Sequence, residues 1–222
     1  MLKKNCFVIC LFFITTVVFS QDFTFGNYQV ALTSDGTGVV ITRYNGSEKE
    51  VRIPSTIQGL LVKEIGNSSF YGNNTATSII IPEGVTIIRK KAFGNNYWTG
   101  DYSSRIQSIT LPSTLVIIEE GAFYCCSKLT SIVIPENVIE IGKLAFEACY
   151  SLYSVSLPST LQKIEDEAFK DCEKLTYIII PDTVININVG RNLFYRRGNK
   201  NISLNLPSQA AMRRIGYKDN FN

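Results

Sequence analysis

The amino-acid sequence predicts a repeat solenoid, mainly β, in which short strands stack into a parallel sheet. All of its prolines fall at one position of a recurring pattern: 54, 82, 112, 135, 158, 181 and 207. The three steps from Pro112 to Pro181 are 23 residues each. The phenylalanine of an Ala-Phe pair follows eleven residues after four of the prolines, at 93, 123, 146 and 169. A fixed period in the twenties is typical of solenoids.

The strand of each repeat ends at its proline. In the stretch SIVIP, residues 131–135, Ile132 and Ile134 share one side and Ser131 and Val133 the other, because strand side chains alternate. Proline has no N–H to donate, so it ends the strand and turns the chain. We therefore predict a parallel sheet built from the strands that precede the prolines.

A single repeat cannot fold alone. Its roughly five large apolar side chains contribute about 2 kcal/mol each when buried, whereas ordering each of its residues costs about 1.5 kcal/mol. Stacked copies cover each other's open faces and satisfy each other's strand hydrogen bonds. We expect the phenylalanine of each Ala-Phe pair to fill the interior of its coil, with the pair on a short helical turn.

Three cysteines also recur, each three residues after the phenylalanine: Cys126, Cys149 and Cys172. Stacked strands lie about 4.8 Å apart, which brings the equivalent Cα atoms within disulfide range. Their side chains run parallel, however, which favours small buried thiols that donate weak hydrogen bonds to the backbone. The chain has no histidine, so a zinc site is not expected.

The full pattern I-P-x-x-V-x-x-I-x-x-x-A-F-x-x-C-x-x-L resembles the BspA-type leucine-rich repeat of bacterial and protozoan surface proteins. The segment 32–70 is similar to the entry segment of spirochaete-type members. The resemblance covers about residues 23–207. It implies a right-handed leucine-rich-repeat solenoid, a surface or secreted location, and adhesion to host matrix proteins or to other microbes.

The first twenty residues predict a secretory signal peptide. Lys3 and Lys4 precede an apolar run over 6–19, and Val18 and Ser20 supply the small residues of a cleavage site. A retained anchor is the alternative. No later segment is apolar enough to span a bilayer, so we expect a secreted or cell-surface protein without a transmembrane segment after cleavage.

The remaining chain divides into three parts. Residues 21–52 predict an N-terminal β-hairpin cap around the turn-forming Ser34-Asp35-Gly36, and 53–198 hold the repeats. Residues 199–222 predict a basic C-terminal cap, since solenoids need polar ends. From Arg191 onward seven Lys/Arg stand against Asp219 alone, which indicates a solvated tail or, alternatively, an anion-binding patch.

Two features are candidates for partner binding. One is a long insertion between Phe93 and Ile109, because insertions in solenoids map to loops and rigid aromatic residues serve recognition. The other is the outward side of the predicted strands, which is rich in hydroxyl and aliphatic groups and suits a protein partner. The candidate residues are Tyr97, Trp98, Tyr102, Ser108, Thr110, Ser131, Val133, Ser154, Ser156, Tyr177 and Ile179. The alternatives are a loop that only covers a coil and a solvated sheet without a ligand.

The sequence argues against an enzyme. Without histidine, triads and most acid–base mechanisms are unavailable. The acidic clusters 119–120 and 165–167 occupy repeat positions on an outer turn rather than opposite walls of a cleft. No cofactor, metal or nucleic acid partner is expected. The predicted function is a protein-binding adhesion module, and the alternative is an architectural envelope component with no host ligand.

Overall fold

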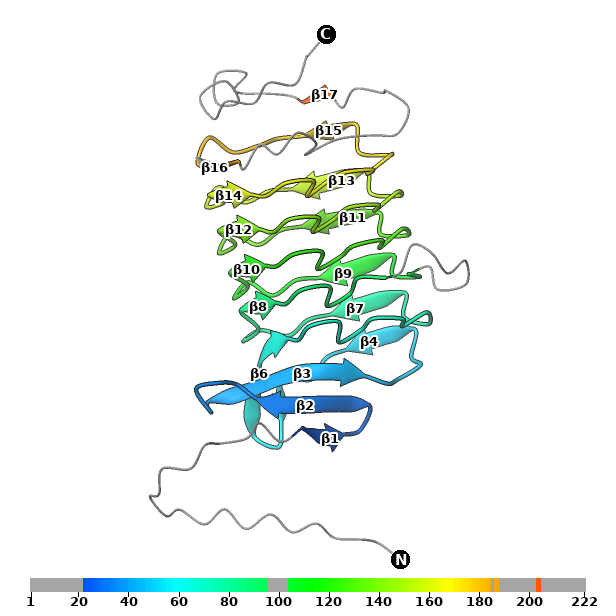
Figure 1. The fold of residues 1–222 in the computed structure, drawn as a ribbon, viewed down its shortest axis with the longest axis vertical. Coiled ribbons are helices and arrows are strands. Elements are labelled where there is room, and N and C mark those ends of the chain that lie inside the picture. Colours follow the sequence, from blue (N-terminus) through cyan, green and yellow to red (C-terminus); the bar gives the residue numbers. More distant parts are fainter. Residues whose placement is uncertain (1–21, 96–103, 185, 188–202, 205–222) are drawn as a thin grey trace, which may run out of the picture.

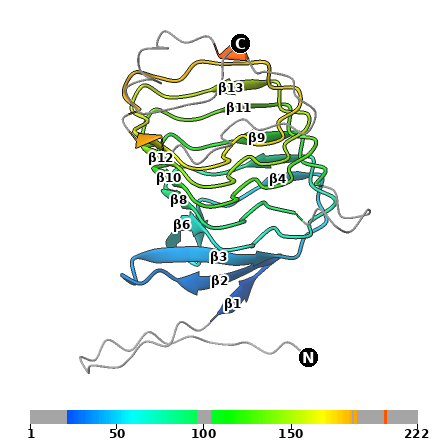
Figure 2. The same ribbon diagram turned by 45° about the horizontal axis from the view of Figure 1, so that its top comes forward.

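The computed structural model describes residues 22–95, 104–184, 186–187 and 203–204, which form a stack of similar coils along one axis (Figure 1). Each coil contributes a short strand to each of two ladders, and the stacked coils surround a single interior (Figure 2). The predicted β-rich repeat solenoid with parallel strands is confirmed. The predicted signal peptide, 1–20, lies outside the described residues, as does the predicted C-terminal cap, 199–222, apart from Ser203–Leu204.

The strands that precede the prolines form the first ladder, as predicted. They pair in parallel as β4-β7-β9, β11-β13 and β15-β17. Their bounds are β4 (Glu50–Arg52), β7 (Ser78–Ile80), β9 (Ser108–Thr110), β11 (Ser131–Val133), β13 (Ser154–Ser156), β15 (Tyr177–Ile178) and β17 (Ser203–Leu204). From Pro82 to Pro181, the carbonyl of the proline then accepts a hydrogen bond from the N–H three residues on, as from Val138 N to Pro135 O at 3.1 Å. Proline thus ends the strand and begins the corner.

A second ladder, which the sequence analysis missed, forms the larger sheet. Its strand order is β1-β2-β3-β6-β8-β10-β12-β14-β16, with β5 paired to β6. Its repeat strands have two residues each: β8 (Ile87–Ile88), β10 (Ile117–Ile118), β12 (Glu140–Ile141), β14 (Lys163–Ile164) and β16 (Asn186–Ile187). The second residue is buried in every coil from β8 to β14. Each of these strands ends at the isoleucine that stands six residues after the proline of its repeat.

The N-terminal end of this sheet contains both antiparallel and parallel pairs. It contains β1 (Phe23–Phe25), β2 (Tyr28–Leu32), β3 (Gly38–Tyr44), β5 (Thr56–Ile57) and β6 (Leu60–Ile65). Strands β2 and β3 form a hairpin, and β3 then pairs in parallel with β6. The strand β4 lies within the range expected for the cap, 21–52, yet pairs with β7 of the repeats.

The short helical turns predicted at the Ala-Phe pairs are not confirmed, since the described residues contain no helix and these segments are turns. In these segments, successive N–H groups donate alternately to a carbonyl of the same turn and to a carbonyl of the next coil. Glu147 N donates to Leu144 O, whereas Phe146 N donates to Ala168 O in the next coil. Leu144 and Ala148 both have a φ of 59°. Left-handed residues at this spacing prevent a continuous helical ladder.

The phenylalanines fill the interior, as predicted. Each of the four is at most 1% exposed: Phe93, Phe123, Phe146 and Phe169. Their rings stack from coil to coil with centroid separations of 5.5, 5.0 and 5.3 Å. Phe70 and Tyr44 extend the stack to the N-terminal hairpin, where the two ring centroids lie 4.8 Å apart. One column of aromatic rings therefore connects the hairpin to the repeats.

Candidate protein-binding face

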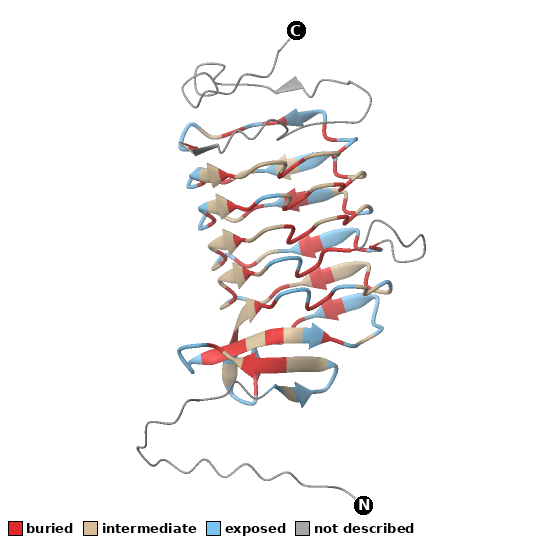
Figure 3. Ribbon diagram, viewed as in Figure 1, coloured by how far each residue is buried: buried red, intermediate tan, exposed pale blue. Residues whose placement is uncertain are grey.

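The outward side chains of the first ladder form a regular surface, which we name the outer strand face. Parallel register aligns Ser78 with Ser108 and Ser131 with Ser154, so equivalent residues stack in columns. The central residues of β9 and β11 are buried and their neighbours on both sides exposed, as Figure 3 shows. The face consists of Ser78, Ile80, Ser108, Thr110, Ser131, Val133, Ser154, Ser156, Tyr177 and Ile179.

All eight strand residues proposed from the sequence are exposed on this face: Ser108, Thr110, Ser131, Val133, Ser154, Ser156, Tyr177 and Ile179. Their character changes along the stack. Val133, on β11 in the middle of the face, is 69% exposed, and Ile179, directly after β15, is 48% exposed. Tyr153, which precedes β13, is 58% exposed and was missed from the sequence because it stands outside the alternating pattern. From β11 to β15, exposed apolar side chains therefore alternate with the serines of β13.

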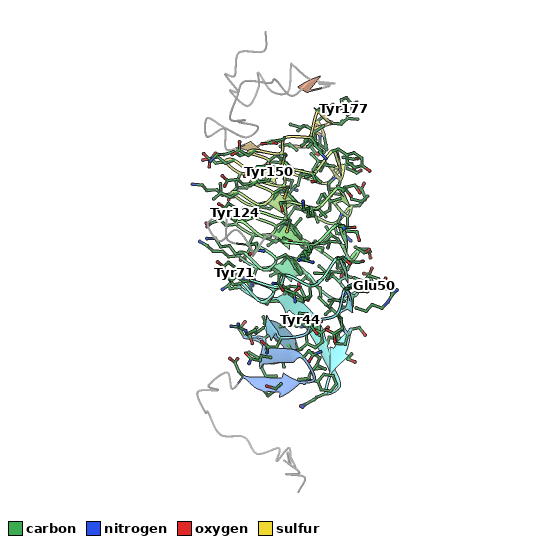
Figure 4. All side chains as sticks on the ribbon, turned by 90° about the vertical axis from the view of Figure 1, so that its right-hand side faces the viewer. Tyr44, Glu50, Tyr71, Tyr124, Tyr150 and Tyr177 are labelled. Carbon is green, nitrogen blue, oxygen red and sulfur yellow. The ribbon has the colours of Figure 1, made fainter. Side chains whose placement is uncertain are left out.

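Charge is absent from the centre of the outer strand face, since none of its ten residues is ionisable at neutral pH. The charged residues Glu50 and Arg52 lie on β4 at its N-terminal end. In Figure 4, Glu50 and Tyr177 project from the same side of the solenoid, and Tyr71 and Tyr124 from the other. A partner that binds the centre of this face would meet hydroxyl and apolar groups, and these cost less to desolvate than charges.

Ion pairs gather instead along the second ladder. Arg89 binds Glu64 and Glu119 of the neighbouring coils, with nitrogen–oxygen distances of 2.8 Å for both. Lys163 pairs with Glu140 at 2.9 Å and with Glu165 at 2.5 Å. The acidic clusters at 119–120 and 165–167 thus contribute to contacts between coils. The sequence analysis placed these clusters on an outer turn and did not predict the ion pairs.

The aromatic residues of the insertion, Tyr97, Trp98 and Tyr102, lie outside the described residues. The two ends of the insertion are well defined. Asn95 is 4% exposed, and its N–H donates to Tyr124 O at 2.8 Å. Ser104 is 1% exposed, and its hydroxyl oxygen accepts a hydrogen bond from Ile106 N at 3.4 Å. The insertion therefore leaves and rejoins the coil at buried residues, which must be kept in any variant of the loop.

The recurring cysteines are buried free thiols that donate to backbone carbonyls, as the sequence analysis favoured. Cys126 donates to Phe93 O at 3.4 Å, Cys149 to Phe123 O at 3.3 Å, and Cys172 to Phe146 O at 3.2 Å. Burial raises the pKa of Cys126 to about 12. Because the thiolate is the reactive form, these groups are poor nucleophiles in the folded protein.

We predict that maleimide labelling of the native protein is slow and becomes fast in denaturant without reductant. Burial and the raised pKa of the Cys126 thiol both suppress thiolate formation, and unfolding removes both effects. Intact mass spectrometry after a timed pulse would count the labelled thiols. Labelling in denaturant that needs prior reduction would instead show a disulfide between neighbouring coils.

In the described part of the chain, no group of three or more His, Cys, Asp or Glu side chains is placed to hold a metal ion. Within the same part, no helix is long and apolar enough to cross a membrane.

Stacked parallel coils with a column of buried phenylalanines define a leucine-rich-repeat protein. The family described as BspA type leucine rich repeat region matches in six copies, over residues 44–99 and 63–202. This protein belongs to that family. The resemblance inferred from the repeat pattern is thereby confirmed.

Solved structures of bacterial proteins share the fold. A leucine-rich repeat protein of T. pallidum, TpLRR, is 34% identical, with a TM-score of 0.66 over 73% of this chain and 72% of that one. A leucine-rich repeat protein of Bacteroides ovatus is 26% identical, with a TM-score of 0.54 over 74% of this chain and 48% of that one. The pneumococcal vaccine antigen PcpA is 24% identical, with a TM-score of 0.60 over 74% and 45% of the two chains.

This chain spans about half the length of the last two proteins. The curated proteins include no match.

Proposed function

We propose that this protein is a secreted or cell-surface, right-handed leucine-rich-repeat solenoid that binds another protein through the outer strand face. The observation that carries the proposal is the set of exposed apolar side chains on the face from β11 to β15, Val133, Tyr177 and Ile179, with Tyr153 exposed beside β13. These side chains are exposed on regular, hydrogen-bonded coils, so little order is lost when a partner covers them. Aromatic and aliphatic groups in a rigid setting are typical anchors of protein interfaces.

Several features support binding rather than catalysis. The family is a repeat family. In this chain the recurring residues of the repeat are mainly the buried phenylalanines, cysteines and aliphatic side chains of the interior. The predicted signal peptide supports an exported protein, and export fits a role in adhesion to host matrix or to another cell-surface protein. The long aromatic insertion, with Tyr97, Trp98 and Tyr102, is the second proposed contact. We propose that it acts together with the outer strand face.

The experiment is a binding assay of the immobilised protein against purified host matrix proteins and an envelope extract of the producing cell. For a ligand found in this way, Ile179→Lys should weaken binding by about tenfold or more, because it places an unpaired charge in a desolvated contact. Leu61→Lys is the matched control. Leu61 and Ile179 are both 48% exposed, and Leu61 lies on β6, away from the face.

The outcomes separate the candidate functions. Equal loss from Ile179→Lys and Leu61→Lys would reject the outer strand face as the site. If only a variant with Tyr97, Trp98 and Tyr102 changed to alanine loses ligand binding, the binding site lies in the insertion. Binding to the producing cell's envelope alone would favour the architectural alternative. Interferometry with matched protein concentrations would measure each dissociation constant.

A further inference from the structure

The ten-stranded sheet ends at β1, whose outer edge pairs with no other strand of the described chain. β1 is the outermost strand at the N-terminal end of the stack in Figures 1 and 2. It consists of Phe23, Thr24 and Phe25, without a charged residue or a proline. Natural sheets usually protect an exposed edge with charges, proline or a bulge. The edge of β1 lacks this protection and can accept a further strand.

The turn after β1 determines which backbone groups face the free edge. The two-residue loop Gly26-Asn27 joins β1 to β2, and Gly26 has a φ of 57°, as such a hairpin turn requires. The carbonyl before the loop accepts from the N–H after it, so Phe25 and Tyr28 form a hydrogen-bonded pair. Bonded and non-bonded pairs alternate along antiparallel strands. The N–H and C=O of Thr24 therefore point away from β2, toward the free edge.

The column of aromatic rings reaches the same end of the molecule. The ring centroid of Tyr28 on β2 lies 5.1 Å from that of Tyr44, which stacks on Phe70. Phe25 stands opposite Tyr28 in the register of β1 and β2, yet it is 44% exposed. Phe23 shares its side of β1, because strand side chains alternate. Solenoid ends are normally polar, so an exposed phenylalanine at this end indicates a contact surface.

The sequence of β1 is its own complement. A two-fold axis through Thr24 would pair two copies of β1 antiparallel, with Thr24 opposite its equivalent and Phe25 opposite Phe23 of the other copy. Each Thr24 N–H would then donate to the Thr24 carbonyl of the other copy, as in any hydrogen-bonded antiparallel pair. Aromatic side chains that face each other across strands add to the stability of such a pair. Two-fold dimers are also the commonest soluble oligomers. A second copy of this chain therefore fits the edge.

We propose that the mature protein forms a two-fold dimer through β1, which makes the two ten-stranded sheets continuous. The predicted cleavage after Ser20 leaves only Gln21 and Asp22 ahead of β1, too few residues to form a covering strand. The outer strand face belongs to the other ladder, so it stays free in both copies whatever it binds. A dimer presents that face twice, which strengthens attachment to a surface that carries several ligands.

The contact is small, so we expect a reversible equilibrium between monomer and dimer. Each copy contributes the three residues of β1, whereas a stable interface takes roughly 20–30 residues from each side. The dissociation constant should be on the order of 0.1 mM. At about 5 µM the protein should then be monomeric, with Phe25 exposed to solvent as in the single chain.

The test is sedimentation velocity of the exported protein, whose first residue is established by intact mass, from about 5 µM to about 1 mM. The sedimentation coefficient should rise with concentration from the monomer value toward that of a dimer. Hydrogen exchange followed by NMR supplies a local measurement. The Thr24 amide should become more protected over the same range, because its N–H is bonded only in the dimer.

Substitutions at the edge separate the dimer from the fold. Thr24→Pro removes the N–H that faces the free edge and leaves the bonds between β1 and β2, and proline is tolerated on edge strands. It should weaken dimerisation at least tenfold and keep the melting temperature of the parent. Thr24→Val retains the N–H and should dimerise as the parent does. Phe25→Lys should also prevent the dimer, because it places a charge at the edge. Tyr71→Lys is its control, since Tyr71 is 46% exposed on a repeat coil away from β1.

The proposal is overturned if the sedimentation coefficient stays constant up to about 1 mM, or if Thr24→Pro associates as the parent does. A Thr24 amide protected equally at every concentration would show that residues of the same chain cover the edge, which also overturns it. Association that Tyr71→Lys removes and Phe25→Lys leaves intact would place the contact on another surface and reject β1.

Discussion

Replacing Phe146 with alanine should lower the free energy of unfolding by about 3–5 kcal/mol. The ring is fully buried, and its centroid lies 5.0 Å from that of Phe123 and 5.3 Å from that of Phe169. Alanine would leave a cavity in the middle of the aromatic column and remove both ring contacts. The coil cannot collapse to fill the space, because Phe146 N and Ala148 N are held by hydrogen bonds to the next coil. Urea denaturation followed by circular dichroism would measure the loss.

The matched control is Phe25→Ala, which removes the same side chain from an exposed site. Phe25 is 44% exposed on β1, so its loss should cost under about 1 kcal/mol. Similar costs for the two variants would contradict the assignment of the phenylalanine column as the core. Because coils contact only their neighbours, Phe146→Ala should also expose amides of adjacent coils to exchange before those of the N-terminal hairpin.

The repeated part of the core could be predicted from the sequence because each coil buries the same side chains. Phe146, Cys149 and Ile132 each stand one period from an equivalent residue, and the structure buries all of them. The strand that ends at Pro135 could be predicted from alternation and from the missing N–H of proline. The outward residues of the candidate face followed from the same alternation, which places Ser131 and Val133 outside when Ile132 is inside.

The second ladder could not be predicted from alternation of buried and exposed residues, because its repeat strands, such as β12 (Glu140–Ile141), have only two residues. The turns around the phenylalanines were also unpredictable from residue type. Leu144 and Glu167 have positive φ, although leucine and glutamate rarely adopt it. Hydrogen bonds between coils hold them there, and such bonds depend on the stack as a whole.

A second large effect is expected at Gly142, where substitution should force two coils apart. Gly142 is equivalent by the repeat period to Glu119 and Glu165, so its glycine is not required by the pattern. A Cβ atom there would lie 2.7 Å from the carbonyl carbon of Glu119 and 2.8 Å from Glu120 N. Both are backbone atoms, which cannot rotate away as the end of a side chain can. We expect Gly142→Ala to lower the free energy of unfolding by about 1–3 kcal/mol or more.

The comparison with Glu165→Ala tests whether this effect comes from backbone approach. That variant installs alanine at the equivalent position of the next coil, where the backbone already accommodates a Cβ atom. It loses the partly exposed ion pair with Lys163 and the exposed hydrogen bond that Lys143 N donates to Glu165 at 3.0 Å, so its cost should stay below that of Gly142→Ala. Equal denaturation midpoints for Gly142→Ala and the parent would show that the coils separate at little cost. A large loss confined to Gly142→Ala would show that the close contact between these coils is part of what stabilises the stack.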